Sequence, residues 1–505
     1  MDRRHFLRLE RASRLAALPP SEPPPTAGGL DPFVPSADAP WDRRRAAHLV
    51  RRTGFGYDTR AVDAALGRTP AEAAESILRA AVAAGTPPRP SWADLLRPPN
   101  SAPQGERDAY NRANREGIQE ASRRTIWEAL GLRHRGSPLR ERMALLWHNM
   151  IPISRRETGN RAHRLWEYNN VLRRHALGDY RDLVREIGLT QAMLDYLDGN
   201  RSRRGNPNEN YAREVLELFT MGISGPDGSQ NYTQEDITEL SRAFTGWQTP
   251  QSSLTAVFNP NRFDNEAKTV FGVTGNFDYD GAITLIFEQR RAAIAHYVAR
   301  RIYREFVHDT PNEEVVAQLA TVLDDADFQI EAAVRTLLAS SHFHSEGVIG
   351  SRVASPFEHA VGLLGALQTP DPAGEAAYLL RRTREAGQEP FDPPDVSGWD
   401  VGRLWLDTST LPARWTSSDE LVSRFEVDVD FVMTFPNPYD PYEVIDEMAA
   451  RLLAVPLTYD ASQEALEILL GGIPDYEWNP TADTAPGRIR ATMRHLARLP
   501  EFQLT

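Results

Sequence analysis

The segment from Asn206 to Gly222 constrains the fold most, because it contains a helix with a recognisable signal at each end. Asn206 is a favourable N-cap, Pro207 suits the first helical position, and Glu209 follows the cap by three residues, as in a capping box. Gly222 suits the left-handed residue that ends a helix. Between the two ends, apolar residues recur at helical spacing and form one stripe: Tyr211, Val215, Leu216, Leu218 and Phe219. The segment therefore predicts an amphipathic helix packed against a core.

A polar row runs beside that stripe, formed by Asn210, Arg213, Glu214 and Glu217 at i, i+3, i+4 and i+7. Three interpretations are open. In the first, the row is a solvated face on which Arg213 bridges Glu209 and Glu217, and each pair stabilises the helix by only about 0.3–0.5 kcal/mol. In the second, the acids and amides point into a cleft. In the third, they form a buried network that holds neighbouring helices in register, which requires a partner for every member.

A second capped helix follows after a short turn that contains glycine. Thr233 can cap this helix, Asp236 lies three residues later, and Gly246 can end it before Trp247. Because the connection is so short, we expect the two helices to form an antiparallel hairpin.

Capped amphipathic segments of the same kind recur along the 505-residue chain, so the predicted fold class is mainly α, with a large multi-helix body. Residues 251–280 depart from this pattern, because they alternate in polarity between turn residues, as a small β-hairpin insertion does. Residues 386–415 form a long loop rich in tryptophan. A loop of this length either binds something or packs as a compact lid. Alternatively, its tryptophans only anchor it to the body.

These changes of pattern predict four parts of the chain. Residues 1–40 are a degenerate signal-like segment and a proline-rich linker, and residues 41–250 are a helical domain that contains the two capped helices. Residues 251–280 are the insertion. Residues 281–505 are a C-terminal helical region that packs on the first and carries the tryptophan loop.

Several stretches together resemble one bacterial family, called "domain of unknown function 1800". They are RERMALLWHNM (140–150), HALGDYRDLVREIGLTQAMLDYLDG (175–199), NPNENYAREVLELFTMGI (206–223), YTQEDITELSRAFTGW (232–247) and PPDVSGWDVGRLWLDTSTLPAR (393–414). The resemblance runs from about Ala46 onward, and it implies kinship without an established activity. The chain departs from the family pattern at Met150 and Phe263, where relatives have histidines. The departure at Met150 weakens a two-histidine metal site that includes His148. The departure at Phe263 weakens a histidine-based mechanism next to Asp264 and Lys268.

Composition excludes some classes of function. The formal net charge of −13 argues against a nucleic-acid partner, since phosphate binding needs a basic surface. The chain has no cysteine, which excludes disulfides, thiolate nucleophiles and zinc–thiolate sites. No apolar run approaches the ~20 residues that a transmembrane helix needs.

The first residues leave two compartments open. Arg3, Arg4, Phe6 and Leu7 resemble the start of a twin-arginine export signal, and the family resemblance also favours a periplasmic or exported protein. A working signal then needs 7–15 apolar residues, and charged residues interrupt that region here: Glu10, Arg11 and Arg14. The alternative is an amphipathic helix in a cytoplasmic protein.

Candidate site residues come from the polar side chains near these motifs. The candidate catalytic residues are His148, Arg213, Glu214, Glu217, Asp236 and Lys268, the last of which is the only lysine in the chain. The candidate ligand-binding residues are Asn208, Asn210, Trp247, Trp399, Arg403 and Arg414. The sequence identifies neither a metal nor a cofactor, because motifs such as HExxH and a phosphate-binding glycine loop are absent.

Two hypotheses for function follow. In the first, the protein is a ligand binder or an enzyme with a polar pocket of carboxylates, histidine and arginines, closed by the tryptophan loop. Whether it catalyses a reaction is left open. In the second, it is a non-catalytic helical partner. The resemblance implies a phosphatase- or sulfatase-like protein as that partner, because genes for such proteins often lie near those of the family.

Overall fold

The structure is a computed structural model of the chain, and it describes residues 22–130, 137–367, 374–424 and 429–505. Within these residues the fold is mainly α, as predicted, with two small antiparallel sheets of two strands each. The signal-like residues Arg3 to Leu7 lie outside the described part of the chain. No helix in the described part is both long and apolar enough to cross a membrane.

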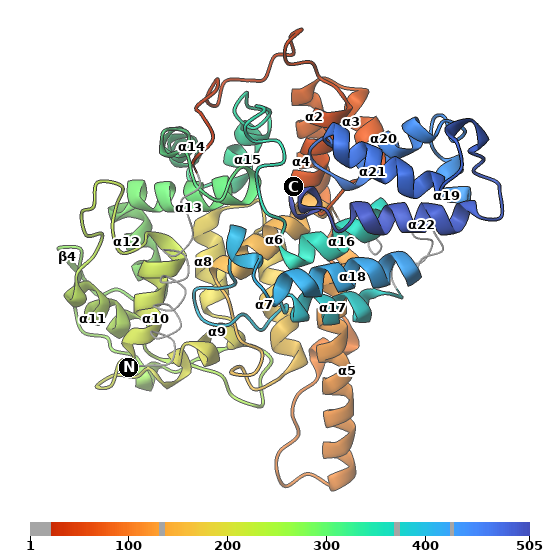
Figure 1. Ribbon diagram of the computed structural model, residues 1–505. Coiled ribbons are helices and arrows are strands. Elements are labelled where there is room, and N and C mark those ends of the chain that lie inside the picture. The colour runs from red at the N-terminus through yellow and green to blue at the C-terminus, as the bar shows by residue number, and fades with distance from the viewer. Residues whose placement is uncertain (1–21, 131–136, 368–373, 425–428) are drawn as a thin grey trace.

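The first and larger hydrophobic core is built mainly by the helices before residue 340 (Figure 1). These helices are α2 (Arg43–Thr53), α3 (Thr59–Leu66), α4 (Pro70–Ala83), α6 (Pro138–Met150), α7 (Ala162–Arg174), α8 (Tyr180–Gly188), α9 (Gln191–Tyr196), α10 (Glu209–Glu214), α11 (Gln234–Ala243), α12 (Tyr279–Gln289), α13 (Arg291–Phe306), α14 (Glu313–Asp325) and α15 (Ile330–Leu338).

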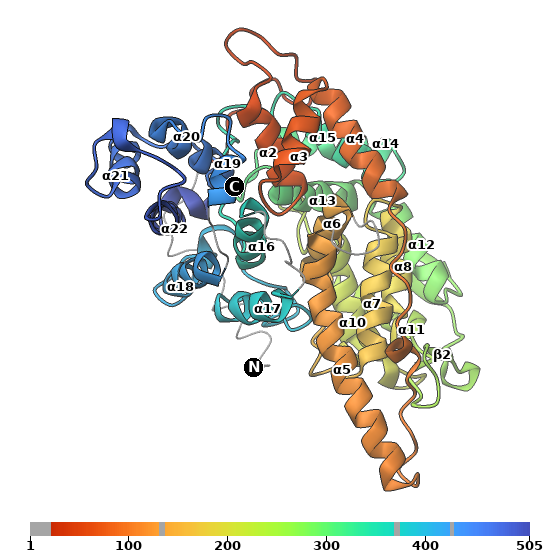
Figure 2. The ribbon, with the colours of Figure 1, turned by 90° about the vertical axis from the view of Figure 1, so that its right-hand side faces the viewer.

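A second core is built by the helices that follow, which lie together on one side of the molecule (Figure 2). These helices are α16 (Pro356–Ala366), α17 (Ala376–Glu385), α18 (Thr410–Arg424), α19 (Val429–Met433), α20 (Pro441–Leu452), α21 (Tyr459–Leu470) and α22 (Ala485–Leu496). Short 3₁₀ turns join several elements of both cores: η1 (Ser91–Asp94), η2 (Gly199–Arg201), η4 (Pro260–Arg262), η5 (Gly402–Trp405), η6 (Asp475–Glu477) and η7 (Pro500–Gln503). The predicted division of the chain at residues 250 and 280 stays a prediction.

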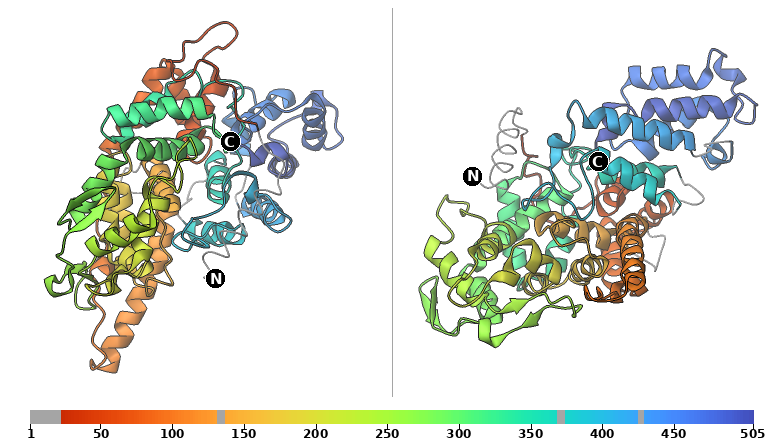
Figure 3. Two further views of the ribbon diagram at one scale, coloured as in Figure 1. Left: turned by 90° about the vertical axis from the view of Figure 1, so that its left-hand side faces the viewer. Right: turned by 90° about the horizontal axis from the view of Figure 1, so that it is seen from below.

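Helix α5 (Gln104–Ala129) belongs to both cores. Ile118 and Ala121 pack in the first core, and Ile126 and Trp127 one to two turns later pack in the second. The N-terminal part of α5 projects from the body (Figures 2 and 3). One continuous helix therefore joins the two hydrophobic clusters.

The helix of the Asn206 segment begins two residues later than predicted. Asn208 is its N-cap and accepts a hydrogen bond from the backbone N–H of Asn210 at 2.8 Å. The reason is local, because the carbonyl of Asn206 accepts from the backbone N–H of Arg203 at 3.3 Å and belongs to the preceding turn. Gly222 has a φ of +74°, as the sequence predicts for the end of this helix.

After α10 the same helix widens into a π-helix, η3 (Val215–Thr220), which the sequence pattern did not predict. A π-turn leaves carbonyl groups that need other partners. Tyr180 donates through its hydroxyl to the carbonyl of Phe219, and Tyr297 donates to the carbonyl of Leu218 at 2.9 Å. These two tyrosines stabilise the wide turn and fix it to α8 and α13.

The β-structure is confirmed but starts earlier than expected. Strand β1 (Trp247–Gln248) pairs with β2 (Val257–Phe258), and β3 (Lys268–Val270) pairs with β4 (Val273–Gly275). β3 packs on α11, so the insertion lies against the second capped helix.

The tryptophan loop is shorter than predicted, because α18 begins at Thr410. Asp407 starts this helix by accepting hydrogen bonds from the backbone N–H groups of Ser409 and Thr410 at 2.7 and 2.8 Å. Arg414 therefore lies on a helix and not in the loop. The irregular segment that remains, residues 386–409, is called the tryptophan loop below.

The proline-rich stretch before α2 follows the surface of the first core (Figure 1). Phe33 donates its backbone N–H to the carbonyl of Ala339 at 2.8 Å, and Asp31 accepts from the backbone N–H of Ser341 at 2.7 Å. Asn312 donates through its side chain to the carbonyl of Pro24 at 2.9 Å. The stretch is thereby attached to the start of α14 and to the end of α15.

Candidate functional site

A cavity of about 80 Å³ lies where α6, α13, the start of α16 and the tryptophan loop meet. Of its charged side chains, Arg352 and Glu358 are buried and the others are half-buried. Residues of both cores line it. They are Phe55, Leu145, Leu146, Asn149, Arg301, Arg304, Glu305, Asp309, Arg352, Ser355, Glu358, Gln388, Asp400, Val401, Gly402 and Trp405. It is called the charged cavity below.

Glu358 is fixed at one wall of the charged cavity by the cap of α16. Ser355 and Glu358 form a capping box, in which one carboxylate oxygen of Glu358 accepts from the backbone N–H of Ser355 at 2.8 Å. The other oxygen accepts from Arg142 at 2.5 Å and from Arg352. Burial opposes ionisation, but the two guanidinium groups outweigh it and hold the pKa of Glu358 well below its usual range. Glu358 is therefore an ionised structural anchor.

Arg142 joins α6 to three other segments behind the same wall. It donates to the carbonyl of Gly54 at 2.5 Å and forms ion pairs with Glu358 and, at 2.9 Å, with Glu305. Burial raises the pKa of Glu305, although Arg142 and Arg352 oppose this. The wall thus combines two arginines with two acids of unequal acidity.

Arg52 adds positive charge close to this wall. Its side chain is fully buried, and it donates through Nη2 to the carbonyl of Val348 at 3.1 Å. Burial lowers its pKa, and the neighbouring Arg352 and Arg142 lower it further. Its Nε and Nη1 atoms have no hydrogen-bond partner within the described residues. The acidic groups of the cavity therefore interact electrostatically with several guanidinium groups at once.

Arg304 and Asp309 are two charged groups of the cavity that form no ion pair within the described residues. Arg301 forms none either, but it donates to the Tyr297 hydroxyl at 2.7 Å. Arg304 donates through Nε to the backbone carbonyl of Asp309 at 3.1 Å, and no described residue accepts from its terminal nitrogens. Burial lowers its pKa to about 10, and the nearby Arg300 and Arg301 contribute. The Asp309 carboxylate receives no hydrogen bond and forms no ion pair within 4.0 Å in the described part of the chain, and burial raises its pKa. A donor and an acceptor are thus available side by side.

Gly402 brings the tryptophan loop against Asp309. Its φ is +58°, and a Cβ atom at this position would lie 2.5 Å from Oδ2 of Asp309. Only glycine adopts this conformation and also leaves space for the carboxylate. The loop therefore closes one side of the cavity through its backbone.

His148 and Asn149, at the end of α6, hold the other part of the tryptophan loop. Phe391 donates its backbone N–H to Nε2 of His148 at 2.9 Å, and Trp399 donates its backbone N–H to Oδ1 of Asn149 at 2.6 Å. Since Nε2 is an acceptor, the proton of the neutral ring lies on Nδ1, which donates to the Tyr168 hydroxyl at 2.7 Å. Burial lowers the pKa of His148 to about 3. A neutral His148 positions the loop, and its role as a proton carrier stays a prediction.

The polar row of the Asn206 segment, which lies on α10 and η3, contacts α11 and the turn before it. Glu209 accepts from Gln234 and Thr238, both at 2.8 Å, and Arg213 donates to Gln234 at 2.9 Å. Tyr232 donates to Glu217 at 2.7 Å. Residues later in the first helix contact residues earlier in the second one, since Glu209 reaches Thr238 and Glu217 reaches Tyr232. The two helices are therefore antiparallel, as predicted.

The remaining predicted residues of this helix lie close to the same hairpin. Asn208 donates through its amide to the carbonyl of Asp198 at 3.3 Å, and Asn210 donates to that of Leu197 at 3.4 Å. Glu214 is buried on α10. The sequence placed these residues correctly beside one another, and none of them lines the charged cavity.

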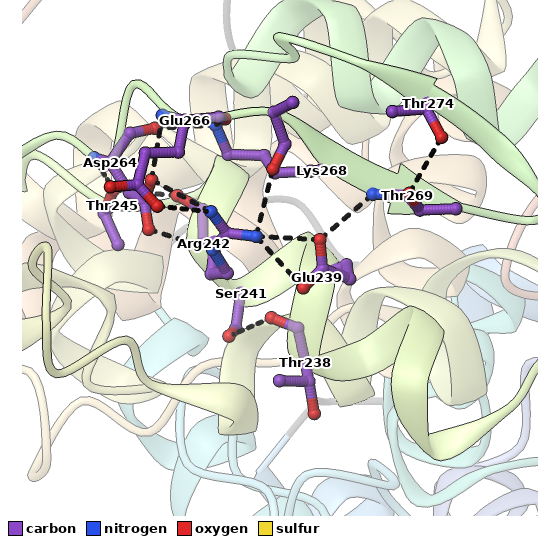
Figure 4. A network of polar contacts seen from close by, with 11 residues as sticks. Thr238, Glu239, Ser241, Arg242, Thr245, Asp264, Glu266, Lys268, Thr269 and Thr274 are labelled. Carbon is purple, nitrogen blue, oxygen red and sulfur yellow. Dashed lines mark hydrogen bonds and ion pairs between the residues drawn. The ribbon is translucent and has the colours of Figure 1, made fainter.

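Lys268 belongs to a polar network that fixes the insertion on α11 (Figure 4), and Asp236 makes a separate contact between the two. Asp236 completes the capping box with Thr233 and also accepts from the backbone N–H of Phe271 at 2.7 Å. Lys268 donates to the carbonyls of Asp264 and Glu266 at 2.6 and 2.8 Å. Burial lowers its pKa although the Asp264 charge opposes the shift.

Arg242 is the centre of this network. It forms ion pairs with Asp264 at 2.9 Å and Glu239 at 2.8 Å, and it donates to the carbonyl of Ala267 at 3.1 Å (Figure 4). The hydrogen bonds to Asp264 and Glu239 raise the pKa of Arg242, although burial opposes this. The sequence did not indicate a role for Arg242 beyond its position in the stretch 232–247, which resembles the family.

The predicted aromatic and arginine ligands are divided among three places. Trp247 packs against Phe258 in the β1–β2 pair, with ring centroids 5.3 Å apart and ring planes tilted by 56°. Trp399 is buried with its ring 4.8 Å from that of His148, and Arg403 directly follows Gly402 in the loop. Arg414 is buried and donates to the carbonyl of Ala354 at 2.8 Å. Of these, Trp399 and Arg403 lie on the loop that closes the charged cavity.

Sequence reasoning missed Arg304, Asp309 and Arg352, which lie on or just after segments without a recognisable motif. Within the described residues no group of three or more histidine or acidic side chains could hold a metal ion. The polar side chains that line the charged cavity are mainly guanidinium and carboxylate groups.

The model of the family described as "Protein of unknown function (DUF1800)" matches residues 48–504. No curated protein and no solved structure matches the chain. The match covers the charged cavity, both cores and the two motif helices.

Proposed function

Because the chain belongs to the family described as "Protein of unknown function (DUF1800)", we propose a function from its geometry. The protein binds a small carboxylic acid that also carries a hydroxyl or amino group, and it does so in the charged cavity. The observation that carries this proposal is the unpaired couple of Arg304 and Asp309.

Arg304 supplies the recognition of the carboxylate. A guanidinium group binds a carboxylate best through two parallel N–H···O bonds, and such bonds are about twice as strong as neutral ones. The Nε contact to the Asp309 carbonyl fixes the plane of the Arg304 guanidinium and leaves both terminal nitrogens for the ligand. Buried Arg52 and Arg142 make the surroundings still more favourable for a negative group.

Asp309 supplies the acceptor for the second group of the ligand. A buried carboxylate without a donor is costly, and this cost is the reason for its raised pKa. A hydroxyl or ammonium group of the ligand would remove that cost by donating to it. The pair therefore favours a ligand with an acid at one end and a donor a few atoms away.

The volume limits the ligand to a small molecule. If each heavy atom occupies the space that a bound water needs, a cavity of about 80 Å³ holds roughly five to eight heavy atoms. Lactate, glycolate, alanine and serine have this size and both groups. In this proposal His148, Trp399 and Arg403 act by keeping the tryptophan loop in place.

The test uses the purified full-length protein and isothermal titration calorimetry with lactate, glycolate, alanine, serine, phosphate and sulfate. We expect saturable binding of at least one of the first four. Arg304→Gln and Asp309→Asn should each weaken that binding by about 10- to 100-fold, since each removes hydrogen bonds to a charged group.

Matched controls come from the same region. Arg300 lies one turn before Arg304 on α13 and pairs with Glu313 on the surface, and Asp325 is exposed at the end of α14. Arg300→Gln and Asp325→Asn should bind as the wild type does. The absence of binding by all six compounds, or equal weakening in the control variants, would contradict the proposal.

A complex with a phosphatase- or sulfatase-like protein stays a prediction from the family resemblance. Co-expression of the two chains followed by size-exclusion chromatography tests it independently of small-molecule binding.

A further inference from the structure

An apolar groove of about 330 Å³ lies between α2 and α20, apart from the charged cavity. Ala47 and Ala449 face it from the two helices, and Leu453, Val455 and Leu457 line it along the segment after α20. Ligand pockets of about 300–1,000 Å³ are usually apolar with a few polar groups that orient the ligand. The groove has these dimensions and this chemistry.

One guanidinium group at this groove is buried without a carboxylate. Arg51 is 6% exposed, and its Nη2 donates to the carbonyls of Ala450 and Arg451 at 2.6 and 3.3 Å. No described residue accepts from its Nε or Nη1, and no acidic side chain of the described chain lies within 4.0 Å of it. The Arg51 guanidinium also lies over the Tyr57 ring, 5.2 Å from its centroid. Its charge therefore meets a ring face and two backbone carbonyls but no carboxylate.

The other two arginines of the groove differ in this respect. Arg43 pairs with Glu447 at 3.1 Å and also donates to the Tyr57 hydroxyl, and Arg44 pairs with Glu346 at 2.6 Å. The charge of these two is already balanced by acids. Arg51 alone is left to bind an anionic group of a ligand.

We propose that this groove is a binding site for an unbranched fatty acid. The carboxylate accepts from the free nitrogens of Arg51, and the hydrocarbon chain lies along the alanine and leucine side chains between α2 and α20. This site is separate from the charged cavity and does not depend on the function proposed for it.

The occupant follows from the charge and the shape together. A neutral alcohol would leave the Arg51 charge unpaired, and a cationic amphiphile would be repelled by it. A short acid such as acetate would leave the apolar groove in contact with water. A single carboxylate on a chain of several methylenes satisfies both features.

The first experiment uses the full-length wild-type protein and calorimetric titration with hexanoate, octanoate and decanoate below their micelle concentrations. We expect saturable binding with one site, and each methylene should strengthen it by about three- to fourfold until the groove is full. Octanoate should bind at least about tenfold more tightly than 1-octanol, and octyltrimethylammonium should not bind.

The second experiment uses variants. Arg51→Gln should reduce octanoate binding to the level of octanol, and Ala450→Trp, which fills the groove, should weaken both. Arg60→Gln is the matched control, because Arg60 is exposed on α3 and does not line the groove. Circular dichroism establishes that each variant is folded before it is titrated.

Three results would overturn the proposal. They are equal affinities for octanoate, octanol and the cationic amphiphile, binding that does not saturate, and unchanged binding in Ala450→Trp. If Arg51→Gln does not fold, the comparison of acid with alcohol on the wild type still decides the role of the charge. These results do not depend on whether lactate, glycolate, alanine or serine binds in the charged cavity, because the two sites are separate.

Discussion

Arg304 donates through Nε to the backbone carbonyl of Asp309 at 3.1 Å, yet the guanidinium of Arg304 and the carboxylate of Asp309 form no ion pair with each other. The two side chains lie five residues apart and line the same cavity. Opposite charges that share a buried space usually neutralise each other, because an unpaired charge is costly. Here Nε of Arg304 is bonded to the backbone of Asp309 and not to its carboxylate, so neither charge is neutralised by the other.

Ligand binding in the charged cavity should weaken in acid. Burial raises the pKa of Asp309, so the free protein holds a proton there at a pH at which an ordinary aspartate is ionised. A protonated carboxyl is a poor acceptor for an ammonium or hydroxyl group, so affinity should rise with pH through this titration. Calorimetry from pH 4 to pH 8 measures the rise. Asp309→Asn should show a smaller rise and not a flat profile, because Glu305 then remains in the cavity with a pKa that burial raises. An unchanged rise in that variant would exclude Asp309 as the cause.

Gly402→Ala should impair both stability and binding. The φ of +58° disfavours any side chain by roughly 1–2 kcal/mol, and the new Cβ would also displace the Asp309 carboxylate. Gly228→Ala is a matched control, because Gly228 has a φ of +79° with no atom within 4 Å of a new Cβ. Urea unfolding should show a larger loss for Gly402→Ala, and only this variant should bind the ligand more weakly. Equal effects in the two variants would contradict the contact.

His148 should make the protein less stable as the pH falls below neutrality. Its folded-state pKa is about 3, whereas an exposed histidine has a pKa near 6.5, so between these values the unfolded chain binds a proton that the folded chain does not. Each pH unit in this window then costs about 1.4 kcal/mol of unfolding free energy. The slope of that free energy against pH should be smaller by this amount in His148→Phe. Other buried histidines remain in both proteins and cancel in the comparison.

Lys268 should resist acylation in the folded protein. Its side chain is 1% exposed, and its amine donates to two backbone carbonyls. The lowered pKa would by itself favour reaction, because more of the amine is neutral, so resistance must come from burial. Treatment with an acetyl succinimidyl ester and mass spectrometry of the peptide that contains Lys268 measures this. The amine should react rapidly in urea, and rapid reaction under native conditions would refute the buried network.

Most of the helices could be predicted because their ends are local features. Thr69, Thr233 and Ser355 form capping boxes, and each needs only a residue three positions later in the sequence. Breaks within longer helical patterns were harder to predict. The apolar pattern from Asp179 to Tyr196 predicts one helix. The structure divides it into α8 and α9, because Thr190 accepts from the N–H of Met193 and starts a new helix.

The charged cavity could not be predicted, because its parts come from distant segments. Arg142, Arg304 and Glu358 are separated by more than fifty residues at each step, and no spacing rule relates them. The length of the tryptophan loop predicts a binding segment or a compact lid, and its tryptophans leave simple anchoring to the body as the alternative. Its contact with Asp309 depends on the φ of Gly402, which the sequence permits but does not specify.

Helix α5 places successive turns in the two hydrophobic cores, with Ala121 in one and Ile126 in the other. This part of α5 contains no proline, which would interrupt its hydrogen bonds. The two cores therefore cannot move apart unless α5 unwinds or one of its apolar turns leaves the core in which it packs and meets water.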